Sequence, residues 1–529
     1  MARLSSALVL LAAGVAAASP TKAVKVAPTT VSGTADMHDG CIHMQIVHST
    51  NTNYFGKRAV ELALANRSDV AYYAKLSFGT PAQPQFVQLD TGSFELWLNP
   101  TCDGLSLSDA SFCEAVGNFN TSNSSTITPL NETKVLQYGI GSANISYVRD
   151  SIGLPGTTSV LKQVQFGVAS STSDEFAGIL GIGFGQGLTT NYANFVDELT
   201  DQNITQVRAF SLALGSKDEQ EGVVVFGGVD TSKFSGTLAR VPIIPAAQSP
   251  DGVPRYWVNM SSVSLTAGKN TESTESTGSS KTTTKTATKT STSKATASTK
   301  AVTSTYANSS MAVFLDSGST LTLLPAGLAD SIAADFGVVD GPSSSGFYYV
   351  DCSYASANGT LNFAFPGVSI SVPFHELVRQ SGSQCMLGIQ ASSQFALLGD
   401  TFLRSAYVPV VIDQTDNDIW MAQYTNCGST PAALATTQSL VALTGDCSPG
   451  ENIIVVTTTP SIPFFSPTTS SSATAITAVQ TAKASASPSP STSSIKSAAA
   501  RTAPGILHSS AVLMLTSALL AVALVDQLL

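Results

Sequence analysis

Two short segments of this sequence share one pattern, and that repeat constrains the fold more than any other feature. In residues 86–93 and 313–320 an apolar stretch leads to an aspartate, which is followed by a hydroxyl residue, a glycine and a serine. The apolar stretch predicts a strand, and the glycine allows a tight turn that brings the carboxylate of Asp90 or Asp316 to a loop tip. The other turn residues, whose hydroxyls can hold the carboxylates, are Thr91, Gly92, Ser93, Ser317, Gly318 and Ser319. Two copies about one domain length apart predict two lobes that each present one carboxylate to a shared cleft.

A facing pair of carboxylates has a definite chemical use. Two like charges roughly 3 Å apart cannot both ionise, so the pair keeps one proton at pH values where a lone aspartate is fully charged. The ionised member can take a proton from water while the protonated member donates to a substrate carbonyl oxygen. The pair therefore predicts acid-favoured peptide hydrolysis without a covalent intermediate.

Around these turns the sequence resembles the pepsin family of aspartic proteases. Residues 73–83, together with the segment that runs from Asp90 to Trp97, are similar to that family's first lobe, and residues 316–320 and 396–404 are similar to its second lobe. The resemblance extends over about residues 70–425. The alternative, two aspartate turns on unrelated strands, is disfavoured because several motifs occur in the family's order.

The resemblance implies a mainly β, bilobal pepsin-like aspartic protease fold with the active-site cleft between two lobes. It also implies that Asp90 and Asp316 are the catalytic residues and that Asp400, in residues 396–404, is structural. Residues 397–399 repeat the pattern of residues 179–181, as two related lobes require.

Residues 137–142 resemble the pepsin flap, a hairpin that closes over the substrate. The resemblance implies that Tyr138 closes the site and helps to exclude water, and that Trp97 supports this tyrosine from beneath. Alone, Tyr-Gly-x-Gly would be an ordinary hairpin turn. Its place between Asp90 and residues 179–183 favours the flap.

Two residues near the expected cleft bear on specificity. Ile140 stands at a flap position that is acidic in relatives that prefer basic side chains, so it favours an apolar residue beside the scissile bond. Glu95, five residues after Asp90, favours a basic one. We expect the apolar preference to prevail.

The chain contains seven cysteines. Cys102 and Cys113 flank a polar loop, a spacing that suits a small disulfide in a secreted protein. Cys352 and Cys385 match the disulfide of the pepsin family's second lobe. Cys427 can pair with Cys447, which leaves Cys41 as the odd cysteine; other connectivities remain open.

The amino terminus has the features of a secreted precursor. Residues 1–18 carry one arginine, an apolar run and a small-residue cleavage site, and they predict a signal peptide that is too short to be a membrane anchor. Residues 19–58 end in Lys57 and Arg58, and resemblance to fungal secreted members implies a propeptide that is removed after this dibasic pair. This segment also holds clustered histidines and a cysteine, at His38, Cys41, His43 and His48. A soluble, removable segment is favoured over a metal site there, and we expect no metal and no cofactor.

Between the termini, short alternating strands predict an N-terminal catalytic lobe over residues 59–255 and a C-terminal lobe over residues 256–428. The pattern also predicts helices over residues 191–201 and 325–336. Residues 268–310 are nearly all Ser, Thr, Ala and Lys, which predicts a disordered insertion inside a hairpin whose return strand carries Asp316. Its hydroxyl residues suit O-glycosylation, and its lysines offer sites for cleavage into two associated chains.

The carboxyl terminus changes composition at about residue 428. Residues 429–497 predict a Ser/Thr-rich stalk. Residues 498–529 combine a spacer with an apolar tail, which is typical of a removed glycosylphosphatidylinositol (GPI) signal, with attachment near Ser497. A transmembrane helix is disfavoured because the run is short and no basic segment follows. This layout resembles the yapsin-like, surface-anchored aspartic proteases of fungi.

Bulk composition agrees with a secreted protease. Only 12% of the residues are charged and the net charge is −10, so no basic face is expected to bind nucleic acid. Nine Asn-x-Ser/Thr sites fit a glycoprotein. We expect a monomeric aspartic endopeptidase that acts on proteins or peptides and is held at the plasma membrane or cell wall by a GPI anchor. The competing hypothesis is a catalytically inactive wall glycoprotein that uses the same scaffold as an adhesin.

Overall fold

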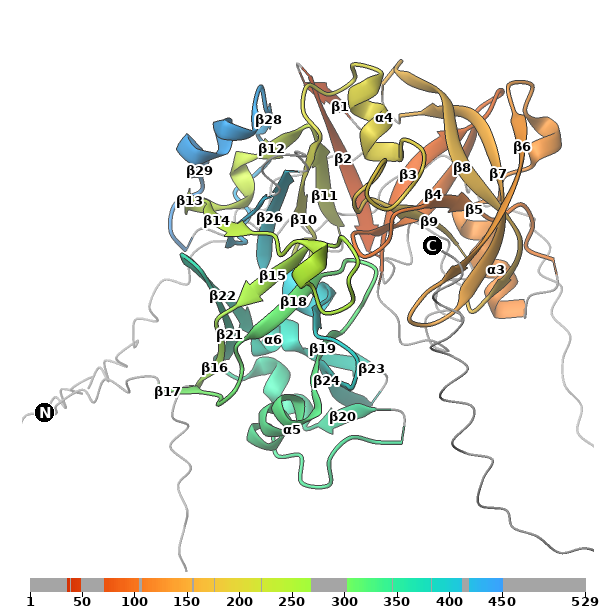
Figure 1. The fold of residues 1–529 in the computed structure, drawn as a ribbon. Helices are drawn as coiled ribbons and strands as arrows, with labels where there is room; N and C mark the ends of the chain where they lie inside the picture. Colours follow the sequence, from red (N-terminus) through yellow and green to blue (C-terminus); the bar gives the residue numbers. More distant parts are fainter. Residues whose placement is uncertain are drawn as a thin grey trace, which may run out of the picture. The chain divides into compact units, whose positions relative to one another are not determined.

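The computed structural model describes residues 36–38, 40–48, 71–103, 107–154, 157–175, 177–219, 221–267, 302–344, 346–381, 383–411 and 418–450. The chain divides into two units, Met1–Ser466 and Pro467–Leu529, and every described residue belongs to the first. The described part is built mainly from β-strands, as predicted (Figure 1). The signal peptide, Ser497 and the expected GPI signal lie outside the described residues.

One large sheet begins in the first half of the chain and is completed by strands from the second half. Its order is β14 (Ala239–Pro242), β27 (Asp418–Gln423), β26 (Ala406–Val411), β10 (Ala209–Ala213), β11 (Glu221–Phe226), β2 (Cys41–His48), β3 (Tyr72–Phe78), β4 (Gln83–Asp90), β9 (Gly178–Gly181), β5 (Leu96–Leu98), β8 (Val160–Ser173), β7 (Ser142–Gly153) and β6 (Thr128–Gln137), with β1 (Asp36–His38) beside β2. Because β26 and β27 come from the expected second lobe, backbone hydrogen bonds join the two lobes directly.

The second lobe contains two smaller sheets, which lie below the first in Figure 1. The first is ordered β15 (Trp257–Met260), β18 (Met311–Leu315), β25 (Leu397–Leu398), β19 (Thr322–Pro325), β24 (Gln384–Ser392) and β20 (Phe347–Val350), with β23 (Val378–Ser381) paired to β24. The second is ordered β17 (Val302–Thr305), β16 (Ser262–Ala267), β21 (Gly359–Phe365) and β22 (Val368–Pro373).

The Ser/Thr/Lys-rich insertion leaves the fold at the end of the β16–β17 hairpin. Ala267 and Val302, which flank the segment outside the described residues, are directly paired. The expectation that the return strand carries Asp316 is wrong, because β17 is the return strand and Asp316 follows the next strand, β18. The insertion also ends earlier than residue 310, since residues 302–305 form β17.

The helices are short, and local capping residues determine where several of them begin or end. They are α3 (Leu107–Val116), α4 (Phe195–Asp201), α5 (Ala326–Asp335), α6 (Phe374–Leu377) and α7 (Asp400–Leu403), with 3-10 turns η1 (Thr121–Asn123), η2 (Thr231–Lys233), η3 (Ala246–Gln248), η4 (Cys352–Ser356) and η5 (Thr437–Ala442). The predicted helix at residues 325–336 is confirmed, with Gly337 at φ +80° ending it. The helix predicted from residue 191 begins later, because Asn194 caps it. Helix α3 occupies the loop predicted between Cys102 and Cys113.

The strands that lead to the two aspartates have the same surroundings in both lobes. β4 pairs in parallel with β9, which places Asp90 opposite Gly181. β18 pairs in parallel with β25, which places Leu315 opposite Leu398. A single cluster of buried side chains continues under both lobes. The repeated apolar motifs therefore build two equivalent supports for the aspartate turns.

The described fold includes part of the segment that the sequence analysis assigns to the propeptide. The segment assigned to the propeptide supplies β1 and β2, and β2 is hydrogen-bonded between β11 and β3. Cys41 on β2 is fully buried. His43 on the same strand lies 3.5 Å from Asp230 through its Nε2 atom. Residues 41–48 are thus an integral strand of the sheet in this structure.

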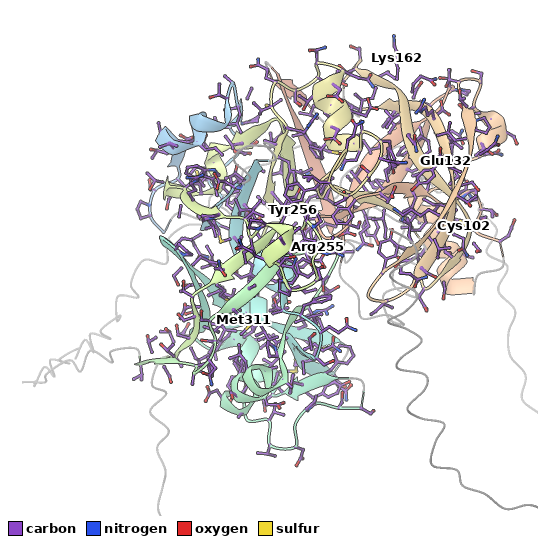
Figure 2. The ribbon with its side chains drawn as sticks, viewed as in Figure 1. Cys102, Glu132, Lys162, Arg255, Tyr256 and Met311 are labelled. Atoms are coloured by element: carbon purple, nitrogen blue, oxygen red, sulfur yellow. A yellow bond between two sulfur atoms is a disulfide. The ribbon has the colours of Figure 1, made fainter. Side chains whose placement is uncertain are left out.

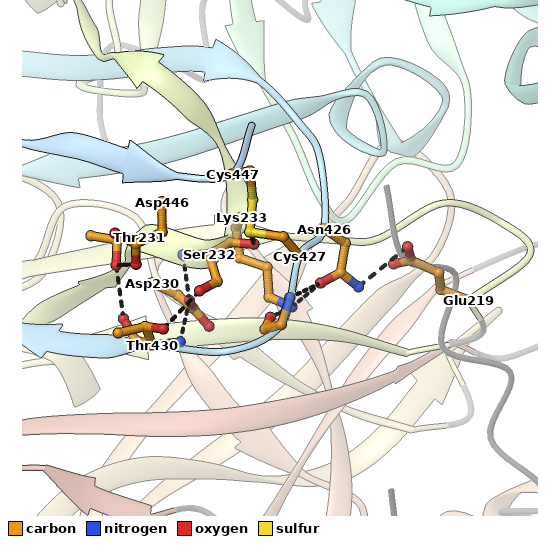
Figure 3. Close-up of a disulfide and its surroundings, with 11 residues drawn as sticks. Glu219, Asp230, Thr231, Ser232, Lys233, Asn426, Cys427, Thr430, Asp446 and Cys447 are labelled. Atoms are coloured by element: carbon orange, nitrogen blue, oxygen red, sulfur yellow. Dashed lines mark hydrogen bonds between the residues drawn. A yellow bond between two sulfur atoms is a disulfide. The ribbon is translucent and has the colours of Figure 1, made fainter. Parts of the chain in front are cut away.

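The carboxyl-terminal boundary also moves, because folded structure continues to Gly450 rather than ending at residue 428. β28 (Pro431–Ala433) pairs with β12 (Gly228–Asp230), and β29 (Thr444–Asp446) pairs with β13 (Ser235–Thr237). A disulfide between Cys427 and Cys447 closes this segment (Figure 3). Beside it, Lys233 Nζ donates to Asn426 Oδ1 at 2.9 Å. We call residues 427–447 the carboxyl-terminal clasp. The other disulfides join Cys102 to Cys113 and Cys352 to Cys385, the pairs that the sequence analysis expects.

Candidate active site

The two aspartate turns face each other and interlock. Asp90 Oδ1 accepts from the Gly92 amide at 2.8 Å, and Asp316 Oδ1 accepts from the Gly318 amide at 3.0 Å. A Cβ atom on Gly92 would collide with the Asp316 carboxylate, and one on Gly318 would collide with the Asp90 carboxylate. Each glycine is therefore required because the opposite carboxylate lies against its backbone.

The hydroxyl residues after the aspartates tie the two turns together. The Thr91 amide donates to Ser317 Oγ at 3.1 Å, and the Ser317 amide donates to Thr91 Oγ1 at 2.9 Å. Each hydroxyl then donates to a carbonyl of the opposite strand, Thr91 to Leu315 at 2.9 Å and Ser317 to Leu89 at 2.8 Å. Both hydroxyl residues are buried. Four reciprocal hydrogen bonds thus fix the separation of the two lobes at the aspartates.

The environment of Asp316 disfavours the ionised form of its carboxyl group. Burial and the neighbouring charge of Asp90 raise the pKa of Asp316 well above its usual range, while the hydrogen bond from the Gly318 amide and the charge of Arg255 act in the opposite direction. A carboxyl whose neighbour is also acidic favours its neutral form. The surroundings of Asp316 therefore favour the neutral form of its carboxyl group.

The predicted flap is a hairpin formed by β6 and β7. Gln137 pairs with Ser142, the Tyr138 amide donates to the Gly141 carbonyl at 3.1 Å, and Gly141 has φ +91°. Trp97 Nε1, fully buried, donates to the Tyr138 hydroxyl at 2.6 Å. Burial and the charge of Asp90 raise the pKa of Tyr138, so this hydroxyl stays protonated.

The two residues expected to influence substrate specificity, Ile140 and Glu95, differ in their exposure to solvent. Ile140 at the hairpin tip is 74% exposed, as a residue available to a substrate would be. Glu95 is 5% exposed, and its carboxylate is occupied by three donors from other elements of the same lobe. The structure thus removes the reason for expecting Glu95 to favour basic side chains.

Arg255 is a residue of the site that the sequence analysis did not single out. Its Nη1 atom donates to the Gly92 carbonyl, and its guanidinium lies over the rings of Phe94 and Phe314, at 5.2 Å and 5.6 Å from their centroids. Asp251 accepts from its Nε atom at 2.8 Å. Figure 2 shows Arg255 next to Tyr256. The two residues immediately precede β15 in the sequence. No local motif points to Arg255, because its partners come from both halves of the chain.

Asp400 lies behind the site, at the start of α7. Its amide donates to the Ser319 carbonyl at 2.8 Å, which connects α7 to the second aspartate turn. Its carboxyl is fully buried, and neither carboxyl oxygen has a hydrogen-bond partner among the residues that the structure describes. Burial raises the pKa of Asp400 well above its usual range, against the influence of Arg404.

Among the described residues, no helix is long and apolar enough to cross a membrane.

A mainly β fold in which two lobes each contribute an aspartate turn to one site, with a tyrosine hairpin beside it, defines the class of aspartic proteases. Residues 71–305 and 271–424 match the family described as eukaryotic aspartyl protease. The chain belongs to this family, and it is an aspartic-type endopeptidase, a hydrolase.

The relatives and a solved structure agree with this assignment. The chain is 33% identical over 388 residues to the probable aspartic-type endopeptidase opsB of Aspergillus oryzae, covering 69% of this chain and 70% of that one. It is 33% identical over 389 residues to secreted aspartic protease 3 of Candida albicans, covering 70% and 84%. The crystal structure of an aspartic proteinase from Irpex lacteus matches with a TM-score of 0.50 and 19% identity, over 73% of this chain and 98% of that one. This last likeness supports the fold.

Proposed function

We propose that Asp90 and Asp316 share one proton and activate a water molecule to hydrolyse peptide bonds at acidic pH. The observation that carries this proposal is the interlocking of the two aspartate turns, in which each carboxylate lies against the glycine of the other turn. The Thr91 and Ser317 hydrogen bonds support it, since they hold the pair in place before any substrate binds.

In the first step ionised Asp90 takes a proton from the water, whose oxygen attacks the peptide carbonyl carbon. Asp316 gives its proton to the carbonyl oxygen, so that a neutral tetrahedral diol forms. Asp90 then passes its proton to the amide nitrogen, the C–N bond breaks, and a diol proton returns to Asp316. Tyr138, held by Trp97, closes over the site and excludes bulk water. Activity should decline as the pH rises through the raised pKa of Asp316, because the proton donor is then lost.

The test is peptide hydrolysis between about pH 3 and 6 by processed protein, with Asp90→Asn and Asp316→Asn as variants. Loss of a proton-transfer group should lower kcat by about a thousandfold or more. Asp340→Asn is the matched control, since Asp340 is exposed and distant from the turns in sequence. Folded, processed protein that cleaves nothing in a diverse peptide library would favour the inactive adhesin scaffold instead.

We propose further that the enzyme is secreted as a zymogen and works at the cell surface. The sequence features that support this are residues 1–18, the dibasic pair Lys57-Arg58 and the tail after residue 498, and a relative at 33% identity is named a secreted protease. Glycosylation and a GPI anchor near Ser497 belong to the same proposal. Release of active enzyme from intact cells by a phosphatidylinositol-specific phospholipase is the expected result. Enzyme that stays cell-bound after this treatment, or that is found only in the medium, would contradict anchoring.

A further inference from the structure

Glu95 is a buried acid that the hydrolytic mechanism does not use. It lies between the first aspartate turn and β5, and the Gly181 amide donates to its carbonyl at 3.0 Å. The Ile182 amide donates to the Asp90 carbonyl at 2.8 Å. The backbone at Glu95 is therefore fixed on the same strand, β9, that supports the catalytic turn.

The carboxylate of Glu95 is the common acceptor of three elements. Lys134 on β6 contacts Glu95 Oε1 through its Nζ atom at 2.8 Å, and the Tyr147 hydroxyl on β7 donates to the same oxygen at 3.0 Å. The Tyr192 hydroxyl, from the loop before α4, donates to Oε2. The rings of Tyr147 and Tyr192 meet edge to face, with centroids 5.5 Å apart. Both strands of the flap hairpin thus converge on one carboxylate.

This contact lies at the base of the flap. Lys134 is four residues before Tyr138, and in the hairpin it is paired with Ile145. Tyr147 and Tyr192 pack in the same apolar cluster as Trp97, whose indole holds the Tyr138 hydroxyl. A buried acceptor of three donors has only one arrangement that satisfies all of them, so it fixes the relative positions of the elements that supply the donors.

We propose that Glu95 is a positioning residue that anchors the base of the flap, through Lys134 and Tyr147, to the segment carrying Asp90. The anchor sets how often Tyr138 occupies the position over the substrate. The inference rests on the proposed function of the flap, and it assigns Glu95 to enzyme geometry rather than to recognition of basic substrate side chains.

The experiment compares Glu95→Gln, Lys134→Met and the double variant in processed enzyme. Lys134→Met is the principal variant, because Lys134 is 47% exposed and we expect its loss to leave the fold intact. We expect kcat/KM and the affinity for a transition-state inhibitor to fall by about three- to tenfold in each single variant. The double variant should lose no more kcat/KM or inhibitor affinity than the more affected single variant, since the two substitutions remove the same contact. Lys134→Arg, which keeps the cation, should restore kcat/KM to within about twofold.

Hydrogen exchange of peptides covering residues 130–147 provides a second measurement that does not depend on activity. The amides of the hairpin should exchange faster in Lys134→Met than in the wild type, because the anchor no longer restricts opening. Lys162→Met is the matched control. Lys162 is an exposed lysine on β8 of the same lobe, and it is not among the described donors to the Glu95 carboxylate. The control should change neither the exchange rate of the hairpin amides nor kcat/KM.

Three outcomes would overturn the inference. They are unchanged flap exchange in Lys134→Met, unchanged kcat/KM with a lower melting temperature only, and additive losses in the double variant. If the wild-type enzyme itself showed no acid-dependent cleavage, the proposed function would fail, and the exchange measurement would still decide whether Glu95 anchors the hairpin.

Discussion

At the scale of single residues, the hydrogen bonds between Thr91 and Ser317 can be tested directly by substitution. Ser317→Ala removes the donor to the Leu89 carbonyl and leaves the buried Thr91 amide without its acceptor. Losing buried partners in this way should lower the free energy of unfolding by about 2 kcal/mol, measured by urea denaturation. Ser317→Thr keeps the hydroxyl, as Thr91 does in the first lobe, and should be nearly neutral. Equal losses in the two variants would mean that side-chain volume, rather than hydrogen bonding, limits this position.

The same residues show how far the sequence predicts a site. Asp90, Asp316 and their glycines are predictable because each turn is encoded locally, in consecutive residues that occur twice. Glu95 and Arg255 are not, because their partners are distant in sequence. Tyr192 reaches Glu95 and Arg255 reaches Gly92 only after the lobes have folded. A charged residue that is neutralised inside the fold looks, in sequence, the same as one that faces a substrate.

At the scale of elements, the β16–β17 hairpin predicts what happens when the insertion is removed. Ala267 and Val302 are paired, so two residues suffice to connect them. Replacing residues 268–301 by Asn-Gly should leave kcat/KM within about twofold and the melting temperature within about 2 °C, since closing a shorter loop changes the chain entropy little. If the wild type is cut in this segment, the shortened enzyme should migrate as one chain after reduction. A large loss of activity would show that the insertion takes part in catalysis or folding.

The predicted end of the second lobe, at residue 428, lies before the end of the folded structure at Gly450, and the reason lies in individual elements. Composition averages over a segment, and residues 429–450 are rich in Ser, Thr and Ala on average. Two leucines of the clasp, Leu434 and Leu440, are nevertheless buried in one cluster with Phe234 and Tyr407. The Cys427–Cys447 disulfide closes the loop and reduces the entropy lost on ordering it. A few apolar contacts and one covalent link are therefore enough to fold a segment whose composition indicates a stalk.

At the scale of the whole described fold, the two lobes are joined more firmly than a two-domain pattern suggests. β26 pairs with β10, and Arg404 donates to the buried carboxylate of Glu376 at 2.7 Å. The same carboxylate accepts from the Ser216 hydroxyl of the first lobe at 2.5 Å. Strand order of this kind depends on pairing between distant segments, so the sequence predicts two lobes but not the sheet that joins them.

The joined fold carries buried acids whose titration should set its pH range. The pKa values of Asp316 and Asp400 are raised in the folded protein above the unfolded value of about 3.9. Between that value and the raised ones the folded state binds more protons than the unfolded state, so stability falls as the pH rises. The contribution of these groups is fully present below about pH 4 and is lost as the pH passes through their folded pKa values.

Asp400→Asn isolates one of these groups, because asparagine is neutral at every pH and similar in shape. In an Asp90→Asn background, which prevents self-digestion, the variant should gain about 1–3 kcal/mol over its parent near pH 7. The gain should shrink or reverse near pH 4, because the raised pKa of Asp400 keeps its carboxyl protonated there and neither side chain brings a charge into the interior. Urea denaturation at several pH values measures the difference, with Asp340→Asn as the exposed control. Parallel stability curves for parent and variant would mean that Asp400 does not change its protonation on folding, and that its charge is compensated within the fold.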